Sequence, residues 1–137
     1  EVYYQQQLKR LAELKDSIHL NYLVIDYLEQ DEMWMLLKKA ALCMMTPISD
    51  GTPNSALEAM SAKCPLILSN LDYDKDLFEN TCLKLNTFDV NELKDSIELA
   101  LHNYDPSLLA VAYDSVKTLG NRSIEMKKLG EIYTSIN

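Results

Sequence analysis

Apolar and polar residues along this chain form two alternating patterns, short apolar runs and longer amphipathic stretches. Apolar runs of roughly four to eight residues are typical of buried strands, whereas apolar residues three or four positions apart are typical of helices. We therefore expect strands at 18–25, 41–46, 65–69 and, more weakly, 82–86. Helices are expected at 3–16, from Gln30 or Asp31 to Ala40, at 53–62, near 73–79, from an Asp89 cap through Leu101, at 106–119 and at 122–135.

Strands that alternate with helices predict an α/β fold in which a parallel sheet is covered by helices on both faces. The 137 residues are enough for one hydrophobic core, and we interpret 1–137 as a single Rossmann-like domain. Gly120-Asn121 is a helix-stop pair that separates the last two helices. These two helices are expected either to pack together or to reach across to something else.

The composition excludes several classes of partner. The formal net charge is −8, so the chain lacks the basic character that binding to nucleic acid or to an anionic membrane surface requires. The apolar runs are also too short to span a membrane. The three cysteines have neither the spacing of a zinc site nor that of a redox pair, so we interpret them as small buried hydrophobic residues of a protein in the reducing cytoplasm.

Most of the functional information lies in one segment, Ser-Asp-Gly-Thr-Pro-Asn-Ser-Ala-Leu-Glu at 49–58, between two apolar strands. Open α/β sheets bind ligands outside the carboxyl ends of their strands, which is where this loop is expected. Thr52 is expected to cap a helix whose first residue is Pro53, and Gly51 permits a positive φ in the preceding turn. The free N–H groups of residues 54–56 would then form an anion site, although an ordinary capped helix explains the turn as well.

Glu58 is the only charged residue between positions 53 and 62. A helix with so little charge is expected to be buried around most of its circumference, and a carboxylate on it is either paired or available to a ligand. Its position beyond the helix start suits ligand hydroxyl groups better than phosphate. The alternative is a glutamate that is favoured there by the helix dipole alone.

The pattern Ser49-Asp50-Gly51-x-Pro53-Asn54-Ser55-x-Leu57-Glu58-Ala59-Met60, followed by Pro65-Leu66-Ile67-Leu68-Ser69, resembles the donor-site motif of retaining GT-B glycosyltransferases. Members of that family contain two facing Rossmann-like domains, and many of them build surface glycans. Two acidic residues with seven positions between them are part of the motif, and Asp50 and Glu58 keep this spacing. The resemblance extends from about residue 8 to residue 103 and is most specific at 41–69.

The resemblance implies that the chain is the donor-binding C-terminal half of such an enzyme. Glu58 would bind the ribose hydroxyls of a nucleoside-diphosphate sugar, and Asp50 would face the transferred sugar as the catalytic residue. The family transfers the sugar with retention of configuration and without an essential metal, so neither a metal nor a cofactor is expected. The donor would be held by five residues around the turn: Gly51, Thr52, Pro53, Asn54 and Ser55.

The sequence also departs from the family pattern. Asp50 replaces the usual glutamate, and Lys63 stands where the family often has glycine. The basic residues that grip the diphosphate in the family lie upstream of this segment, and nothing here replaces them. Four lysines are instead interpreted as solvated surface charges: Lys38, Lys39, Lys63 and Lys75.

By the same resemblance, the first strands of the domain and the whole acceptor-binding domain would be missing. We therefore expect an N-terminal domain or another chain to complete the sheet, and we expect this chain alone to be inactive. Membrane contact, as in a protein peripheral to the inner face of the cell membrane, would come only from the missing segments. Two other functions stay open: a non-catalytic Rossmann-like interaction module, and a flavodoxin-like phosphate-binding domain.

Overall fold

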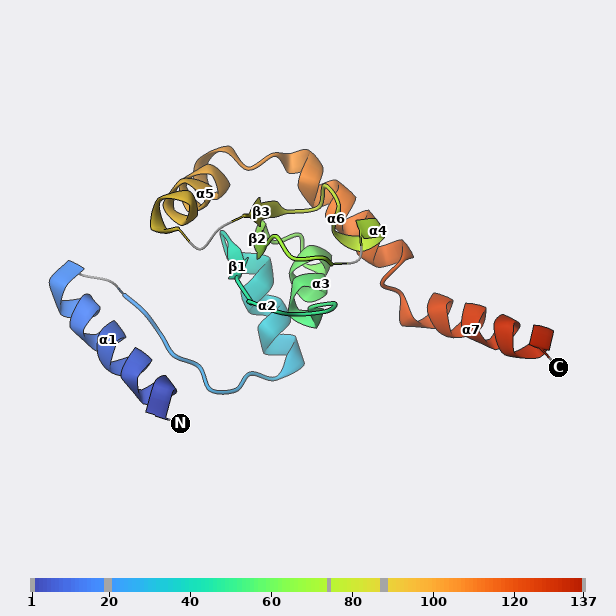
Figure 1. Ribbon diagram of the computed structural model, residues 1–137, viewed down its shortest axis with the longest axis horizontal. Coiled ribbons are helices and arrows are strands. Elements are labelled where there is room, and N and C mark those ends of the chain that lie inside the picture. Colours follow the sequence, from blue (N-terminus) through green and yellow to red (C-terminus); the bar gives the residue numbers. More distant parts are fainter. Residues whose placement is uncertain (1, 19–20, 74, 87–88, 137) are drawn as a thin grey trace.

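The computed structural model describes residues 2–18, 21–73, 75–86 and 89–136, and has a small parallel sheet surrounded by helices (Figure 1). The α/β architecture with a parallel sheet confirms the predicted fold class, a partial Rossmann-like domain. Its strands are β1 (Cys43–Met45), β2 (Leu66–Ser69) and β3 (Leu83–Leu85). The helices in the described part are α1 (Val2–Ile18), α2 (Gln30–Lys39), α3 (Asn54–Ser61), α4 (Lys75–Phe78), α5 (Val90–Asn103), α6 (Pro106–Thr118) and α7 (Arg122–Ile136).

The strands follow one another across the sheet in chain order, β1-β2-β3. Ile67 lies at the centre, paired with Met44 on one side and with Leu83 on the other. All residues of β2 are buried, as expected for a strand with a neighbour at each edge and helices on each face. Because all three strands run the same way, their carboxyl ends meet at a single edge of the sheet.

The side chains of β2 alternate between two hydrophobic clusters, one on each face of the sheet. Leu66 and Leu68 belong to the larger cluster, which includes residues of α3 and α6. Ile67 points to the opposite face and packs with Leu85 and with Ala100 of α5. The period of two in a strand explains this division, and the sheet is covered on both faces as predicted. In Figure 1, α5 and α3 accordingly lie on opposite sides of the strands.

The strand predicted at 18–25 is wrong for the residues that the structure describes. Ile18 ends α1, residues 21–25 form no regular structure, and positions 19 and 20 lie outside the described residues. A strand is stable only where a neighbouring strand accepts and donates its backbone hydrogen bonds, and this segment has none in the described part of the chain. Its apolar side chains are correspondingly exposed, Leu23 to 81 %.

Local signals at the helix ends were more reliable. The Asp89 side chain caps α5 by accepting hydrogen bonds from the N–H groups of Asn91 and Glu92, as predicted. The break at Gly120 is also confirmed, because α6 ends at Thr118 and α7 begins at Arg122. A Cβ atom at Gly120 would lie 2.9 Å from the carbonyl oxygen of Val116, so only glycine fits there without a shift of the backbone.

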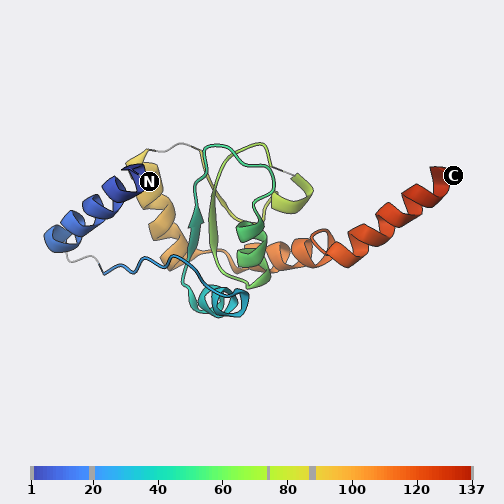
Figure 2. The ribbon, with the colours of Figure 1, turned by 90° about the horizontal axis from the view of Figure 1, so that it is seen from below.

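The first and last helices extend away from the sheet in opposite directions (Figure 2). Helix α7 does not fold back on α6 and exposes several large apolar residues, among them Met126, Ile132 and Tyr133. Of the two arrangements expected for the last two helices, packing together is not seen, and a reach across to something else stays a prediction. No helix in the described ranges combines the length and the apolar character needed to span a membrane.

Candidate functional site

The predicted ligand loop leaves the carboxyl end of β1 and leads directly into α3. The helix begins at Asn54, one residue later than expected, and Pro53 is its N-cap residue. The predicted cap by the Thr52 hydroxyl is therefore wrong, since no side chain caps this helix. Pro53 is buried and its φ is −70°, a value that the proline ring fixes, so the ring sets the direction in which the chain enters the helix.

The N-terminus of α3 presents fewer free N–H groups than predicted. The N–H of Ala56 donates to the carbonyl oxygen of Pro53 at 3.0 Å, which removes it from the expected group of residues 54–56. The N–H groups of Asn54 and Ser55 have no acceptor among the described residues, and both residues are exposed. The anion site predicted at this turn is thus reduced to two backbone donors at the positive end of the helix dipole.

Gly51 does not use the positive φ that a glycine permits. A Cβ atom built on it would meet no other atom within 4 Å, so neither backbone conformation nor packing against the protein requires glycine here. A larger side chain at this position would extend into the open space in front of the turn. The described part of the structure therefore gives no reason of its own for a glycine at this position, and the role of Gly51 toward a ligand stays a prediction.

Glu58 lies four residues after Asn54 and is half-buried. All neighbouring positions from Ala56 to Ala62 are buried or half-buried, as predicted for a helix with so little charge. Within the described residues, the Glu58 carboxylate forms neither a hydrogen bond nor an ion pair with another side chain. Among those residues, no side chain pairs with the carboxylate at this position.

Asp50 precedes α3 in the loop and is exposed. Its carboxylate likewise has no hydrogen-bond or ion-pair partner in the part of the chain that the structure describes. The two acidic residues thus belong to one loop-helix unit at the carboxyl edge of the sheet, with the exposed backbone of residues 51–55 between them. Their roles toward a ligand remain predictions.

Two residues that position the loop were not identified from the sequence as site residues. Ser69, the last residue of β2, is only 2 % exposed and donates its hydroxyl hydrogen to the carbonyl oxygen of Pro47 at 2.8 Å. Its oxygen also lies 3.2 Å from the hydroxyl of Tyr73. The only available signal was a serine that ends an otherwise apolar run. These contacts tie the start of the ligand loop to the neighbouring strand.

The cysteines are not candidates for catalysis. All three thiols are free; Cys64 and Cys82 are buried and Cys43 is half-buried, which confirms the prediction of small hydrophobic residues. Burial raises the pKa of Cys64 to about 11, so its thiol stays protonated and unreactive near neutral pH. No group of three or more potential metal ligands from His, Cys, Asp and Glu occurs among the described residues, which do not include His19.

Comparison with protein families gives a match over residues 2–103 to the family described as "Glycosyl transferases group 1". The matched range includes the whole sheet, the ligand loop, and both Asp50 and Glu58. A search of curated proteins found no match. The match covers most of the chain, and together with the parallel α/β sheet it shows that the protein belongs to the group 1 glycosyl transferases.

Proposed function

We propose that this chain is the donor-binding half of a retaining glycosyltransferase that uses a nucleoside-diphosphate sugar. The observation that carries the proposal is the Glu58 carboxylate, which is half-buried on an otherwise uncharged helix and has no protein partner among the described residues. Burying a carboxylate without a partner costs free energy, so a site that retains one favours a ligand that supplies hydrogen-bond donors. Vicinal ribose hydroxyls supply two such donors.

The rest of the turn supports the same assignment. The N–H groups of Asn54 and Ser55 lie at the positive end of the α3 dipole and are suited to a diphosphate oxygen. Asp50 would then face the transferred sugar as the catalytic residue, with Gly51, Thr52 and Pro53 forming the wall of the donor site. We expect a hexosyl group as the transferred sugar, a glycan or lipid-linked acceptor, and a role in surface polysaccharide synthesis, without a metal ion or a cofactor.

A second domain or chain would complete the enzyme. In the described residues β1 pairs only with β2, so its outer edge presents unpaired N–H and carbonyl groups. Leu23, Val24 and Ile25 lie upstream of this edge strand and are exposed. Further strands at this edge would satisfy β1, and an acceptor-binding domain would close the donor loop. We therefore expect no transfer activity from this chain alone, in a protein of the cytoplasm or of the inner membrane face.

The test is an NMR titration of the chain with UDP, GDP, ADP and inorganic phosphate, in the wild type and in Glu58→Gln. Saturable amide shifts at residues 51–58 with one nucleotide, weakened about tenfold or more in Glu58→Gln, are expected because a charge-assisted hydrogen bond is lost. Glu13→Gln is the matched control, since it makes the same chemical change on α1, away from the sheet, and should leave the affinity within about twofold.

Two results would contradict the proposal. A folded wild type that shows no shift at 51–58 with any nucleotide would favour a non-catalytic interaction module. A Glu58→Gln variant that loses several kcal/mol of stability would place the carboxylate in a structural role, on the order of what the loss of a buried partner costs.

A further inference from the structure

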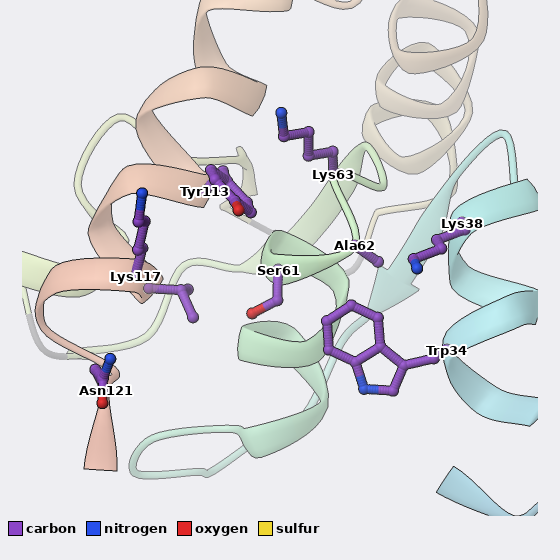
Figure 3. A pocket seen from close by; sticks show the side chains of 9 residues that line it. Trp34, Lys38, Ser61, Ala62, Lys63, Tyr113, Lys117 and Asn121 are labelled. Carbon is purple, nitrogen blue, oxygen red and sulfur yellow. The ribbon is translucent and has the colours of Figure 1, made fainter. Parts of the chain in front are cut away.

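A cavity with a chemistry different from that of the donor turn lies at the other end of α3. It has a volume of about 540 Å³ and lies between α2, α3 and α6 (Figure 3). Small-molecule sites in proteins fall in the range of about 300–1,000 Å³, so the cavity is large enough for a small ligand. Six of its lining residues have side chains suited to ligand contact: Trp34, Lys38, Ser61, Lys63, Tyr113 and Lys117.

The charge of this cavity is opposite to that of the whole chain. Acidic residues outnumber basic ones by 21 to 13, yet three lysines and no aspartate or glutamate line the cavity. Neither of the ion pairs in the described ranges, Lys94–Glu98 and Lys128–Glu125, involves a cavity lysine. No ion pair with an acidic side chain among the described residues therefore offsets the charge of these lysines, which favours an anionic ligand.

Aromatic rings hold two of the three lysines in place. The Lys38 Nζ lies 5.4 Å from the ring centroid of Trp34, and the Lys63 Nζ lies 4.5 Å from that of Tyr113. Such cation–π contacts restrict the ammonium groups without removing their charge. Figure 3 shows the Lys38 ammonium beside the indole, with the Ser61 hydroxyl between Trp34 and α6. Lys38 and Lys63 are exposed, as expected from the sequence, and Lys117 is exposed as well; all three line the same cavity.

Lys63 adopts a backbone conformation that would suit glycine better. Its φ is 56°, in the left-handed region. The N–H of Lys63 donates to Met60 and that of Cys64 donates to Ala59, the two hydrogen bonds of a Schellman motif. Glycine is the usual residue at this position of the motif because it has no Cβ atom. A lysine here costs backbone energy and places an ammonium group at the cavity, which indicates that the charge is used.

At the cavity end of α3, three carbonyl groups of the last turn are satisfied by backbone hydrogen bonds. The carbonyl groups of Glu58, Ala59 and Met60 all accept backbone hydrogen bonds, so the last turn of α3 has little unsatisfied negative potential. The cavity is also separate from the donor turn, because α3 has 8 residues and a helix of that length spans about 12 Å. The donor turn is at its N-terminus and the cavity at its C-terminus.

We propose that this cavity binds the phosphate or diphosphate group of a soluble ligand, at a site distinct from the donor turn. Lysine ammonium groups bind phosphate as point charges, and the Ser61 hydroxyl adds a neutral donor. A membrane surface is a poorer candidate, because a net charge of −8 repels an extended layer of anionic headgroups. A small phosphate ligand meets only the local charge of the cavity.

The experiment uses the single tryptophan of the chain, Trp34, as a probe inside the cavity. Pyrophosphate is titrated at constant ionic strength while Trp34 emission and the amide signals of residues 61–63 are recorded. A saturable change is expected in the wild type and, to the same extent, in Glu58→Gln. Lys117→Gln should weaken binding about tenfold, because each lysine supplies a charge-assisted contact.

Lys39→Gln is the matched control. Like Lys38→Gln, it removes one positive charge from α2, but Lys39 lines a different, apolar cavity near Leu36. It should leave the affinity within about twofold, whereas Lys38→Gln should weaken it about tenfold. Lys63→Gly should weaken binding while raising the melting temperature, a combination that general destabilisation does not produce.

Three outcomes would overturn the proposal. The first is a wild type without a saturable response, and the second is an equal loss in Lys38→Gln and Lys39→Gln, which would indicate a general charge effect. The third is binding to phosphatidylglycerol vesicles without any response to pyrophosphate, which would assign the lysines to a membrane surface. A wild type that responds to pyrophosphate at the cavity but shows no amide shifts at residues 51–58 with nucleotides would refute the donor site but not this one.

Discussion

Replacing Ser69 by alanine tests whether the polar contacts at the carboxyl end of β2 hold the ligand loop in place. The hydroxyl group of Ser69 bonds to the Pro47 carbonyl oxygen at 2.8 Å and lies 3.2 Å from the Tyr73 hydroxyl. Because the serine is buried, both partners would lose a bond that water does not fully replace. Two hydrogen bonds at about 0.5–1.5 kcal/mol each predict a loss of about 2 kcal/mol in the free energy of unfolding.

The assay is urea unfolding followed by circular dichroism at 25 °C, in which a lower midpoint at unchanged slope reports a change in stability. Tyr73→Phe removes only one of the two contacts while keeping the ring that packs on Phe78, so it should cost about 1 kcal/mol. The double variant should lose less than the sum of the two single variants, because both remove the same Ser69–Tyr73 bond.

Ser96→Ala is the control, because Ser96 on α5 is half-buried and has no side-chain hydrogen bond among the described residues. It should change the stability by no more than about 0.5 kcal/mol. Amide exchange at residues 46–52 should speed up in Ser69→Ala and stay unchanged in the control. A loss below about 0.5 kcal/mol with unchanged exchange would refute the anchoring role of Ser69.

Three further predictions concern the turn, the end of α3 and the buried thiols. Gly51→Ala should leave stability unchanged or raise it by up to about 1 kcal/mol, because its Cβ meets no atom, yet it should weaken nucleotide binding in the NMR titration. Unchanged affinity would show that the open space is not used. Lys63→Gly should raise the free energy of unfolding by about 0.5–1 kcal/mol, since relief of the left-handed backbone exceeds the lost contact with Tyr113. A lower urea midpoint would contradict this. Burial raises the pKa of Cys64 from 9.0 to about 11, so the unfolded chain loses its proton first and stability should fall as the pH rises between these values. Urea midpoints at pH 8, 9.5 and 11 check this, and a constant midpoint would argue against it.

The sequence predicted those elements whose signals are local. The apolar run of β2 and the Asp89 cap depend on neighbouring residues only, and both are confirmed. The strand at 18–25 failed because a strand depends on a partner elsewhere, which the pattern of its own residues does not report. Sequence periodicity records which residues favour an extended chain, not whether another strand lies beside it.

For the site, too, the sequence predicted local features but not those that depend on how the helices pack. The position of Glu58 on a largely buried helix followed from the lack of charge around it and is confirmed. The Thr52 cap was wrong because Pro53 occupies the N-cap position, a shift of one residue that propensities do not resolve. The lysine cavity could not be predicted, because Lys38, Lys63 and Lys117 lie far apart in the sequence and meet only when α2, α3 and α6 pack.

In the described part of the chain no strand pairs with the outer edge of β1, which also affects the behaviour of the protein in solution. An edge strand with free backbone groups can pair with the same strand of another molecule, and Met44 adds an exposed apolar side chain to it. The exposed apolar residues 22–25 supply a second segment of each molecule that can associate with another. Aggregation should therefore rise steeply with concentration, and solubilising substitutions such as Met44→Lys would act at this edge without touching either ligand site.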